Sequence, residues 1–154
     1  MQRKILVIAL VLVLIAAVPS AFATGVGVAF GLQPVGGLPG SNVMLSLKMD
    51  NLPLIGLGFS LGQNVVSFGF TADWWMVNEN LFPFINFYLG PGFYLGYQTD
   101  LLLGGRLPIG LNIFPVKSLE LFLEIAPTLA VRLSDPIVFP EFGLQGAFGL
   151  RFWF

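Results

Sequence analysis

The chain has 154 residues, which allows one domain, and its net charge is −1. Hydrophobic residues make up 56% of it and charged residues only 10%, whereas a typical soluble domain is about 25% charged. Most of the surface is therefore not expected to meet water. The absence of Cys and His excludes a disulfide framework, a thiolate metal site and histidine as a general base. The near-neutral charge offers no basic patch for nucleic acid.

The first 23 residues have the features of a targeting segment. Arg3 and Lys4 precede the apolar run Ile5–Val18, and Ala21-Phe22-Ala23 supplies a small-residue cleavage site. This order predicts a cleavable secretory signal peptide over residues 1–23 and a mature domain over residues 24–154. The alternative is an uncleaved membrane helix, for which the run is short because a span needs roughly 20 apolar residues.

The mature chain repeats one pattern, a segment of about ten alternating residues followed by a turn signal. Side chains in a strand alternate with period two, so each segment has one bulky apolar face and one face of Gly, Ala or polar residues. The repetition is typical of an outer-membrane barrel. The segments predicted as strands are Gly25–Gln33, Ser41–Asp50, Leu54–Gly62, Val65–Val77, Phe84–Tyr97, Gly105–Phe114, Ser118–Arg132 and Leu144–Phe154.

Turn residues separate these segments, and prolines interrupt some of them. A turn is expected at Asn78–Asn80 and a loop at Gln98–Gly104. Pro91, Pro108 and Pro127 fall inside predicted strands, where each removes a ladder donor. We expect a bulge near Pro91, because that strand is too long to be regular.

Two further loops lie at the expected outer end, Pro34–Gly40 and Ser134–Glu141. The second is the longest and contains the apolar residues Ile137, Val138 and Phe139. We expect it to fold over the barrel mouth. The alternative is an exposed apolar tip that binds a partner.

The charged residues indicate which face meets lipid. Of thirteen charges in the mature chain, none lies on a bulky face, where Arg or Lys at mid-bilayer costs roughly 2–4 kcal/mol. The bulky face is therefore predicted to face lipid. The alternative is a soluble, lipocalin-like barrel with the bulky face inside, which would leave an outer surface unusually poor in charge. The eight charges on the small-residue face are Lys48, Asp50, Asp73, Arg106, Glu120, Glu124, Arg132 and Arg151.

The last predicted strand carries a possible assembly signal. Phe148, Leu150, Phe152 and Phe154 alternate on one face, and the last of them is the final residue of the sequence. This strand looks like the closing strand of a bacterial outer-membrane barrel, in which the assembly machinery reads a final Phe preceded by apolar residues at alternate positions.

Two segments carry a resemblance to a known group. They are Gly-Arg-Leu-Pro-Ile-Gly-Leu-Asn at 105–112 and Leu-Glu-Leu-Phe-Leu-Glu-Ile-Ala-Pro at 119–127. The chain resembles the small outer-membrane barrel superfamily of OmpA/OmpX-like proteins, most closely its short members of unassigned function. The resemblance implies an all-β, eight-stranded antiparallel up-and-down transmembrane barrel in the bacterial outer membrane. It also implies outer-membrane lipid and the barrel-assembly machinery as partners. Superfamily members serve as tethers, adhesins, narrow channels or lipid enzymes, and the short loops here argue against an adhesin.

The interior charges form the candidate site. Cross-strand neighbours lie within reach of long side chains, so we expect a network of Arg106, Glu124 and Arg151, with Glu120 as a second carboxylate. One interpretation is a structural plug of paired charges in a narrow lumen. The other is a gate or an ion-selective constriction.

No enzyme chemistry is expected from these residues. Glu120 and Glu124 lie four residues apart on one strand, roughly 13 Å, which is too far for a shared acid–base site. We expect no catalytic residue, cofactor or metal. The hypothesis is a monomeric integral outer-membrane barrel with a structural role and a charge-plugged lumen. The alternatives are a narrow pore for ions or small solutes, and a protein that binds partners through Pro34–Gly40 and Ser134–Glu141.

Overall fold

The computed structural model describes residues 24–61 and 66–154. The predicted signal peptide and residues 62–65 lie outside this part of the chain. None of the described residues belongs to a helix with the length and apolarity needed to span a membrane. The strands are β1 Thr24–Val35, β2 Val43–Met49, β3 Leu54–Leu61, β4 Val66–Asp73, β5 Val77–Phe82, β6 Ile85–Leu89, β7 Gly92–Tyr97, β8 Leu101–Arg106, β9 Ile109–Val116, β10 Leu119–Leu133 and β11 Val138–Trp153.

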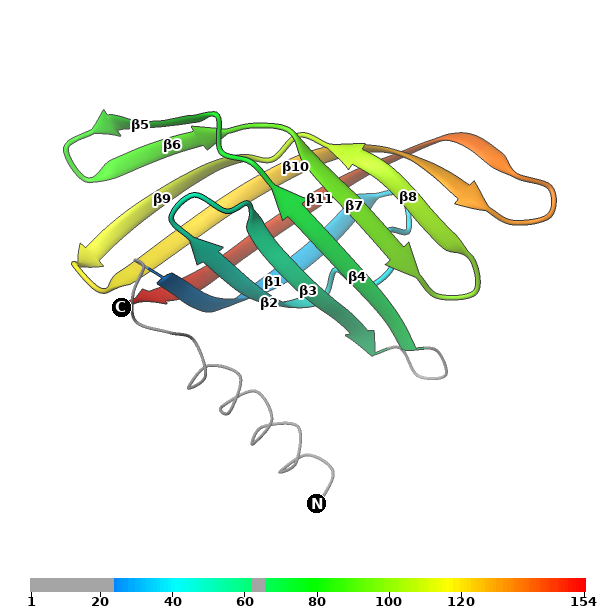
Figure 1. Ribbon diagram of the computed structural model, residues 1–154, viewed down its shortest axis with the longest axis horizontal. Helices are drawn as coiled ribbons and strands as arrows, with labels where there is room; N and C mark the ends of the chain where they lie inside the picture. The colour runs from blue at the N-terminus through cyan, green and yellow to red at the C-terminus, as the bar shows by residue number, and fades with distance from the viewer. Residues whose placement is uncertain (1–23, 62–65) are drawn as a thin grey trace, which may run out of the picture.

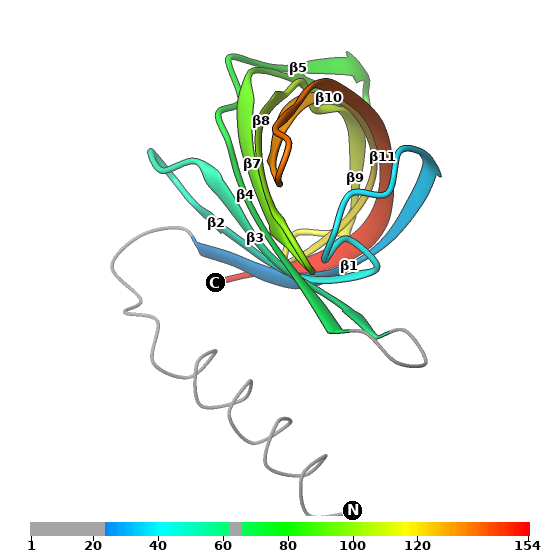
Figure 2. The same ribbon diagram turned by 90° about the vertical axis from the view of Figure 1, so that its right-hand side faces the viewer.

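Eight of these strands form a closed antiparallel ring. The order around it is β11, β1, β2, β3, β4, β7, β8 and β10, and β10 pairs with β11 to complete the circuit. The first and last strands close the barrel in a register that places Gly25 opposite Trp153 and Leu32 opposite Gly146. Figures 1 and 2 show β1 and β11 side by side. The predicted all-β, eight-stranded antiparallel barrel is thus confirmed.

A line of prolines divides part of the wall into two halves. The backbone N–H of Trp74 donates to Pro91 O at 2.9 Å, that of Gly90 to Pro108 O at 3.4 Å, and that of Leu107 to Pro127 O at 3.0 Å. The three prolines therefore lie at one level on neighbouring strands. Because proline has no N–H to donate, the ladder weakens along this line. In place of the bulge expected near Pro91, the strand is interrupted there, between β6 and β7, and Pro108 marks a second interruption, between β8 and β9.

We call the side of the line toward the β10–β11 hairpin the upper half of the barrel. There, β4, β7 and β8 pair with one another and with the second half of β10. Below the line, β5, β6 and β9 pair with one another and with the first half of β10. Only β10 and β11 run unbroken through both halves, at 15 and 16 residues. Figure 1 shows β5 and β6 continuing beyond the end of the β2–β3 turn.

Three segments expected as turns or loops are strands. β8 covers most of the expected Gln98–Gly104 loop, β5 runs through the expected turn at Asn78–Asn80, and β11 begins at Val138 rather than Leu144. Each segment gains a ladder partner, as Leu101 does opposite Leu133 and Asn78 opposite Tyr88. The inter-strand hydrogen bonds outweigh the local turn preference of Asn and Gly, because strand propensity depends strongly on context.

The faces alternate as predicted. Along β10, Glu120, Phe122 and Glu124 are buried inside, while Leu121 and Leu123 are exposed on the outer face. Bulky apolar side chains face outward all around the barrel, so the alternative barrel with the bulky face inside is wrong. Six charged residues are buried in the interior: Lys48, Asp73, Arg106, Glu120, Glu124 and Arg151. Of the other seven charges of residues 24–154, six lie at turns or near hairpin ends, and Glu79 is exposed within β5, opposite Phe87 of β6. Asp50 and Arg132 were expected in the interior, but Asp50 is exposed and Arg132 is half-buried.

The connection between β1 and β2 fills the upper interior. We call residues 36–42 the plug loop. Leu38 is fully buried against Tyr94, Leu102 and Ala130. The Tyr94 hydroxyl donates to Pro39 O at 2.6 Å, and the backbone N–H of Gly40 donates to Ser67 Oγ at 3.0 Å.

The Ser134–Glu141 segment, which was expected to fold over the barrel mouth, forms a hairpin whose tip is exposed. Ile137 and Phe139 are 67% and 68% exposed. Pairing of Arg132 with Val138, and of Ala130 with Glu141, holds the hairpin extended. The plug loop can turn inward because Gly36 and Gly40 adopt φ of 72° and 71°, a region that favours glycine. Of the two loops considered for binding a partner, Pro34–Gly40 is exposed at residues 34–37 and buried at residues 38–40, whereas the β10–β11 hairpin is exposed throughout residues 135–140.

Candidate functional site in the barrel interior

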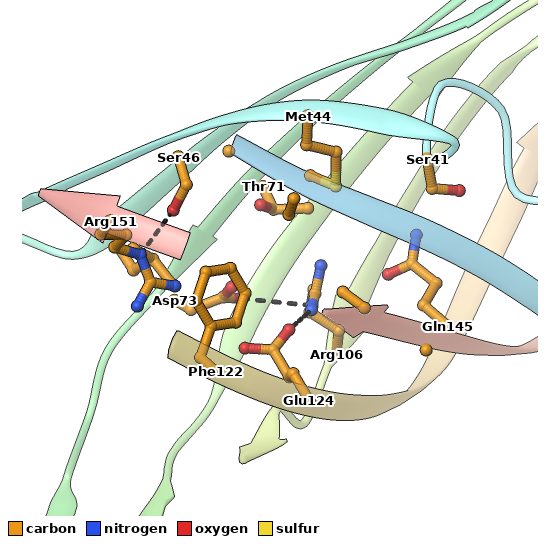
Figure 3. Close-up of a pocket in the computed structure, with 15 residues that line it drawn as sticks. Ser41, Met44, Ser46, Thr71, Asp73, Arg106, Phe122, Glu124, Gln145 and Arg151 are labelled. Atoms are coloured by element: carbon orange, nitrogen blue, oxygen red, sulfur yellow. Dashed lines mark hydrogen bonds and ion pairs between the residues drawn. The ribbon is translucent and has the colours of Figure 1, made fainter. Parts of the chain in front are cut away.

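The first ion cluster lies level with the proline line; we call Asp73, Tyr88, Arg106 and Glu124 the middle cluster. Arg106 Nη2 lies 2.5 Å from Glu124 Oε1, and Arg106 Nε lies 3.3 Å from Asp73 Oδ1. The Tyr88 hydroxyl donates to Glu124 Oε2 at 2.9 Å. All four side chains are buried, and Figure 3 shows Arg106 between the two carboxylates. The Arg106 guanidinium thus neutralises two carboxylates, one from β4 and one from β10.

The second cluster surrounds Glu120, and we call it the lower cluster. Arg151 Nη1 lies 2.7 Å from Glu120 Oε1, and Arg151 Nε donates to Ser46 Oγ at 2.8 Å. Asn112 Nδ2 donates to Glu120 Oε1 at 2.7 Å, and Trp153 Nε1 donates to Glu120 Oε2 at 2.8 Å. A buried ion pair is tolerated when further hydrogen bonds satisfy its remaining groups, and the lower cluster meets that condition.

The structure separates the two arginines that were expected in one network. Arg106 and Glu124 do meet, but Arg151 pairs with Glu120, its direct cross-strand neighbour on β10. The Phe122 ring separates the clusters, with its centroid 3.8 Å from Arg151 Cζ (Figure 3). The expectation of a single Arg106–Glu124–Arg151 network is therefore wrong. Asp73 was recognised as an interior charge but was not expected in the network, because its contact with Arg106 depends on which strands are neighbours.

A glycine on the middle strand lets polar side chains from strands two apart meet. Glycine has no side chain, so long groups on either side can reach across it. The arrangement occurs three times, and in each case the strand register places the glycine opposite both partners. The sets are Asp73–Gly92–Arg106, Tyr88–Gly110–Glu124 and Ser46–Gly27–Arg151.

Little space remains between the clusters. A cavity of about 30 Å³ lies beside Arg106, Glu124 and Gln145. It has room for one or two water molecules, because one water needs roughly 10–15 Å³ measured in this way. Both amide atoms of Gln145 are buried with no hydrogen-bond partner among the described residues. They are suited to hold such a water.

The remaining charges lie near the two ends of the barrel. At the outer end Arg132 forms a paired contact with Glu141 through Nε and Nη2, and its Nη1 lies 3.9 Å from Asp100. At the other end Lys48 Nζ donates to the backbone oxygens of Met49, Asp50 and Leu52 at 2.9, 3.1 and 3.0 Å. Within the described residues, no group of three or more His, Cys, Asp or Glu side chains could hold a metal ion.

The residues of the predicted assembly signal lie on the outer face of β11 and just beyond it. Phe148 is 51% exposed, Phe152 48% and Phe154 71%, while Leu150 is half-buried. Phe148 also contacts the Phe30 ring of β1, with 5.7 Å between the ring centroids. Their place is compatible with recognition from outside the barrel.

Comparisons with protein-family models, with curated proteins and with solved structures found no significant match. The fold is therefore the property of this chain that can be compared with known proteins. The strand pairing makes this chain a closed eight-stranded antiparallel β-barrel, which is compatible with the small outer-membrane barrels that its sequence resembles.

Proposed function

We propose that the protein is an integral outer-membrane barrel with a structural role and a lumen closed by paired charges. The observation that carries this proposal is the distribution of side chains. The outer face is apolar, as at Leu123, which is 59% exposed, and six charged residues are buried inside. Monomeric soluble proteins rarely expose apolar patches larger than a few hundred Å². In a bilayer the same distribution is favourable, because lipid-facing charges are costly.

The packing of the interior supports a structural role over a pore. The plug loop fills the upper part, with Leu38 fully buried. The middle and lower clusters fill the rest and leave a cavity of about 30 Å³. Opening a path would separate buried ion pairs, and removing one partner of such a pair costs about 3–5 kcal/mol. A hydrated ion therefore has no low-energy route.

The targeting and assembly features belong to the same proposal. The predicted signal peptide would carry the chain across the inner membrane. The outward-facing Phe148 and Phe152 would engage the barrel-assembly machinery, and the apolar outer face would meet lipid. Because the eight-stranded ring closes on itself, the strands of that ring need no second copy to pair their edges, which supports a monomer. We propose no catalytic role, since both interior glutamates are committed to arginines.

Conductance across a planar bilayer tests the closed lumen. We expect the refolded mature protein, with insertion verified by flotation with vesicles, to give no steady current steps above the lipid background. Glu124→Gln would then alter stability without producing such steps. Glu79→Gln is the matched control, because Glu79 is exposed on β5 outside the interior clusters.

Steady, salt-dependent steps in the unchanged protein that shift in Glu124→Gln, but not in Glu79→Gln, would contradict the structural role. They would establish the narrow pore instead, with the middle cluster as its constriction. Failure of the protein to float with vesicles would contradict membrane insertion itself.

A further inference from the structure

A second, larger cavity opens at the lower end of the barrel, between the β2–β3 turn and the start of β5. Its volume is about 360 Å³, within the range of roughly 300–1,000 Å³ of small-molecule sites. Trp74, Trp75 and Trp153 all line it, together with Lys48 and Asp50. The chain contains only these three tryptophans. Trp153 also donates to Glu120 of the lower cluster, and Trp75 stacks on Tyr88 of the middle cluster.

The cavity lies where the barrel wall is interrupted. β3 begins at Leu54, opposite Asp73, whereas the neighbouring chain continues through Trp74 into β5. β5 is the last strand in the order of the sheet, so its outer edge has no partner strand among the described residues. Figure 1 shows the β2–β3 turn stopping short of the ends of the β5–β6 and β9–β10 hairpins.

The unpaired edge of β5 indicates how deep in the bilayer this cavity lies. This inference rests on the membrane insertion proposed above. Backbone N–H and C=O groups without partners are not tolerated in the hydrocarbon core, where no water can bind them. The edge of β5 must therefore lie at the level of the lipid headgroups or beyond it. Tryptophans are enriched at that level, because the ring is apolar and its N–H is polar. The cavity thus opens where headgroups lie.

One part of the cavity suits an anion. Lys48 Nζ is held by three backbone oxygens, so its positive charge is fixed in place. Trp75 Nε1 is buried and has no hydrogen-bond acceptor among the described residues. One face of the Trp75 ring stacks on Tyr88, with 4.3 Å between the centroids, which holds the indole in position. Lys48 Nζ lies 5.5 Å from the centroid of the Trp75 ring, so a phosphate on the Trp75 side of the cavity would lie in the field of Lys48.

Another part suits a cation with N–H donors. Asp50 is exposed, and its carboxylate forms no ion pair with the other described residues. The Trp74 ring is 48% exposed beside it in the cavity lining, and aromatic faces attract ammonium groups. An ammonium could donate to Asp50 and lie against Trp74. The cavity therefore offers one site of each sign.

We propose that this cavity binds a phosphoethanolamine group, with the phosphate at Lys48 and Trp75 and the ammonium at Asp50 and Trp74. At headgroup depth its source is a phosphatidylethanolamine lipid. The trimethylammonium of phosphatidylcholine has no N–H to donate to Asp50, and the glycerol of phosphatidylglycerol carries no positive charge. Both lipids should therefore bind more weakly.

Tryptophan fluorescence measures this binding directly, because all three tryptophans line the cavity. The probe is short-chain phosphatidylethanolamine, titrated into the refolded mature protein in non-ionic detergent micelles. We expect a saturable spectral change at concentrations at least tenfold lower than for short-chain phosphatidylcholine or phosphatidylglycerol. Asp50→Asn should weaken binding at least tenfold. Asp100→Asn, at the opposite end of the barrel, should leave it unchanged.

Three outcomes would overturn the proposal: equal binding of the three lipids, an Asp50→Asn variant that binds like the unchanged protein, or binding of soluble phosphoethanolamine without binding of the lipid. Vesicle flotation is scored separately. A protein that floats but does not discriminate between the lipids contradicts this inference alone. A protein that does not float contradicts the membrane proposal on which it rests.

Discussion

At the scale of single residues, the interior depends on glycines that lie between polar partners. Gly92 is paired with both Asp73 and Arg106, and these two side chains meet across it. A Cβ atom on Gly92 would contact the Asp73 carboxylate and come within 2.9 Å of Arg106 Cγ. The absence of a side chain at this position is therefore part of the ion pair's geometry.

We expect Gly92→Ala to lower the free energy of unfolding by about 1–3 kcal/mol, the usual cost of overpacking a tight interior. The measurement is urea unfolding in lipid vesicles. Gly105→Ala is the matched control, since the nearest atom to a Cβ there is Gly92 O at 4.0 Å. Equal stability of the two variants would show that the glycine does not serve the contact between Asp73 and Arg106.

At the scale of elements, the plug loop is the connection among the described residues that places a fully buried side chain, Leu38, inside the barrel. Hydrogen bonds from Tyr94 to Pro39 and from Gly40 to Ser67 hold its backbone. Ser41 Oγ also donates to Leu38 O at 2.8 Å. The buried Leu38 side chain joins β7, β8 and β10 through its contacts. The loop thus completes one of two small hydrophobic clusters in the interior; the other consists of Ala29, Met44 and Phe122.

Leu38→Ala should lower the free energy of unfolding by about 2–5 kcal/mol, as buried Leu→Ala changes do when a cavity remains. Urea unfolding of the refolded protein measures the change. The control is Leu52→Ala, a change of the same chemistry at a turn residue that is 52% exposed. If both variants lost the same stability, Leu38 would not act as the core of the upper interior.

At the scale of the whole molecule, the apolar side chains face outward and most charges are either buried or at the ends. Leu123 lies on the outer face of β10, next to Glu124 of the middle cluster, whereas Ile137 lies at the tip of the β10–β11 hairpin. Their exposed fractions, 59% and 67%, are similar. In water the two positions would be equivalent, but across a bilayer they differ in depth.

Leu123→Arg should therefore cost about 2–4 kcal/mol in lipid vesicles, and Ile137→Arg only about 0–1 kcal/mol. The difference arises because the first arginine lies near the bilayer midplane and the second near or beyond its surface. Reversible unfolding of both variants in vesicles measures it. Similar costs at the two positions would argue against a barrel that spans the bilayer with this orientation.

The positions of the prolines are evident from the sequence, but their alignment depends on how the strands pair. The sequence identifies Pro91, Pro108 and Pro127 as interruptions, because proline lacks an N–H wherever it stands. Their alignment at one level is visible only in the pairing of neighbouring strands. Likewise, local signals predict a turn at Asn78–Asn80 and a loop at Gln98–Gly104, but residues 78–80 and 101–104 are strand because neighbouring strands supply their hydrogen bonds.

What the sequence by itself determined is the all-β class, the strand alternation and the interior face of the six buried charges. These follow from a period of two residues, which is local and needs no partner. Only the tertiary structure decided that Arg151 pairs with Glu120, that Asp73 joins Arg106, and that the plug loop rather than the β10–β11 hairpin enters the barrel. Those contacts depend on register between strands distant in sequence, and a shift of one residue would send every side chain to the opposite face.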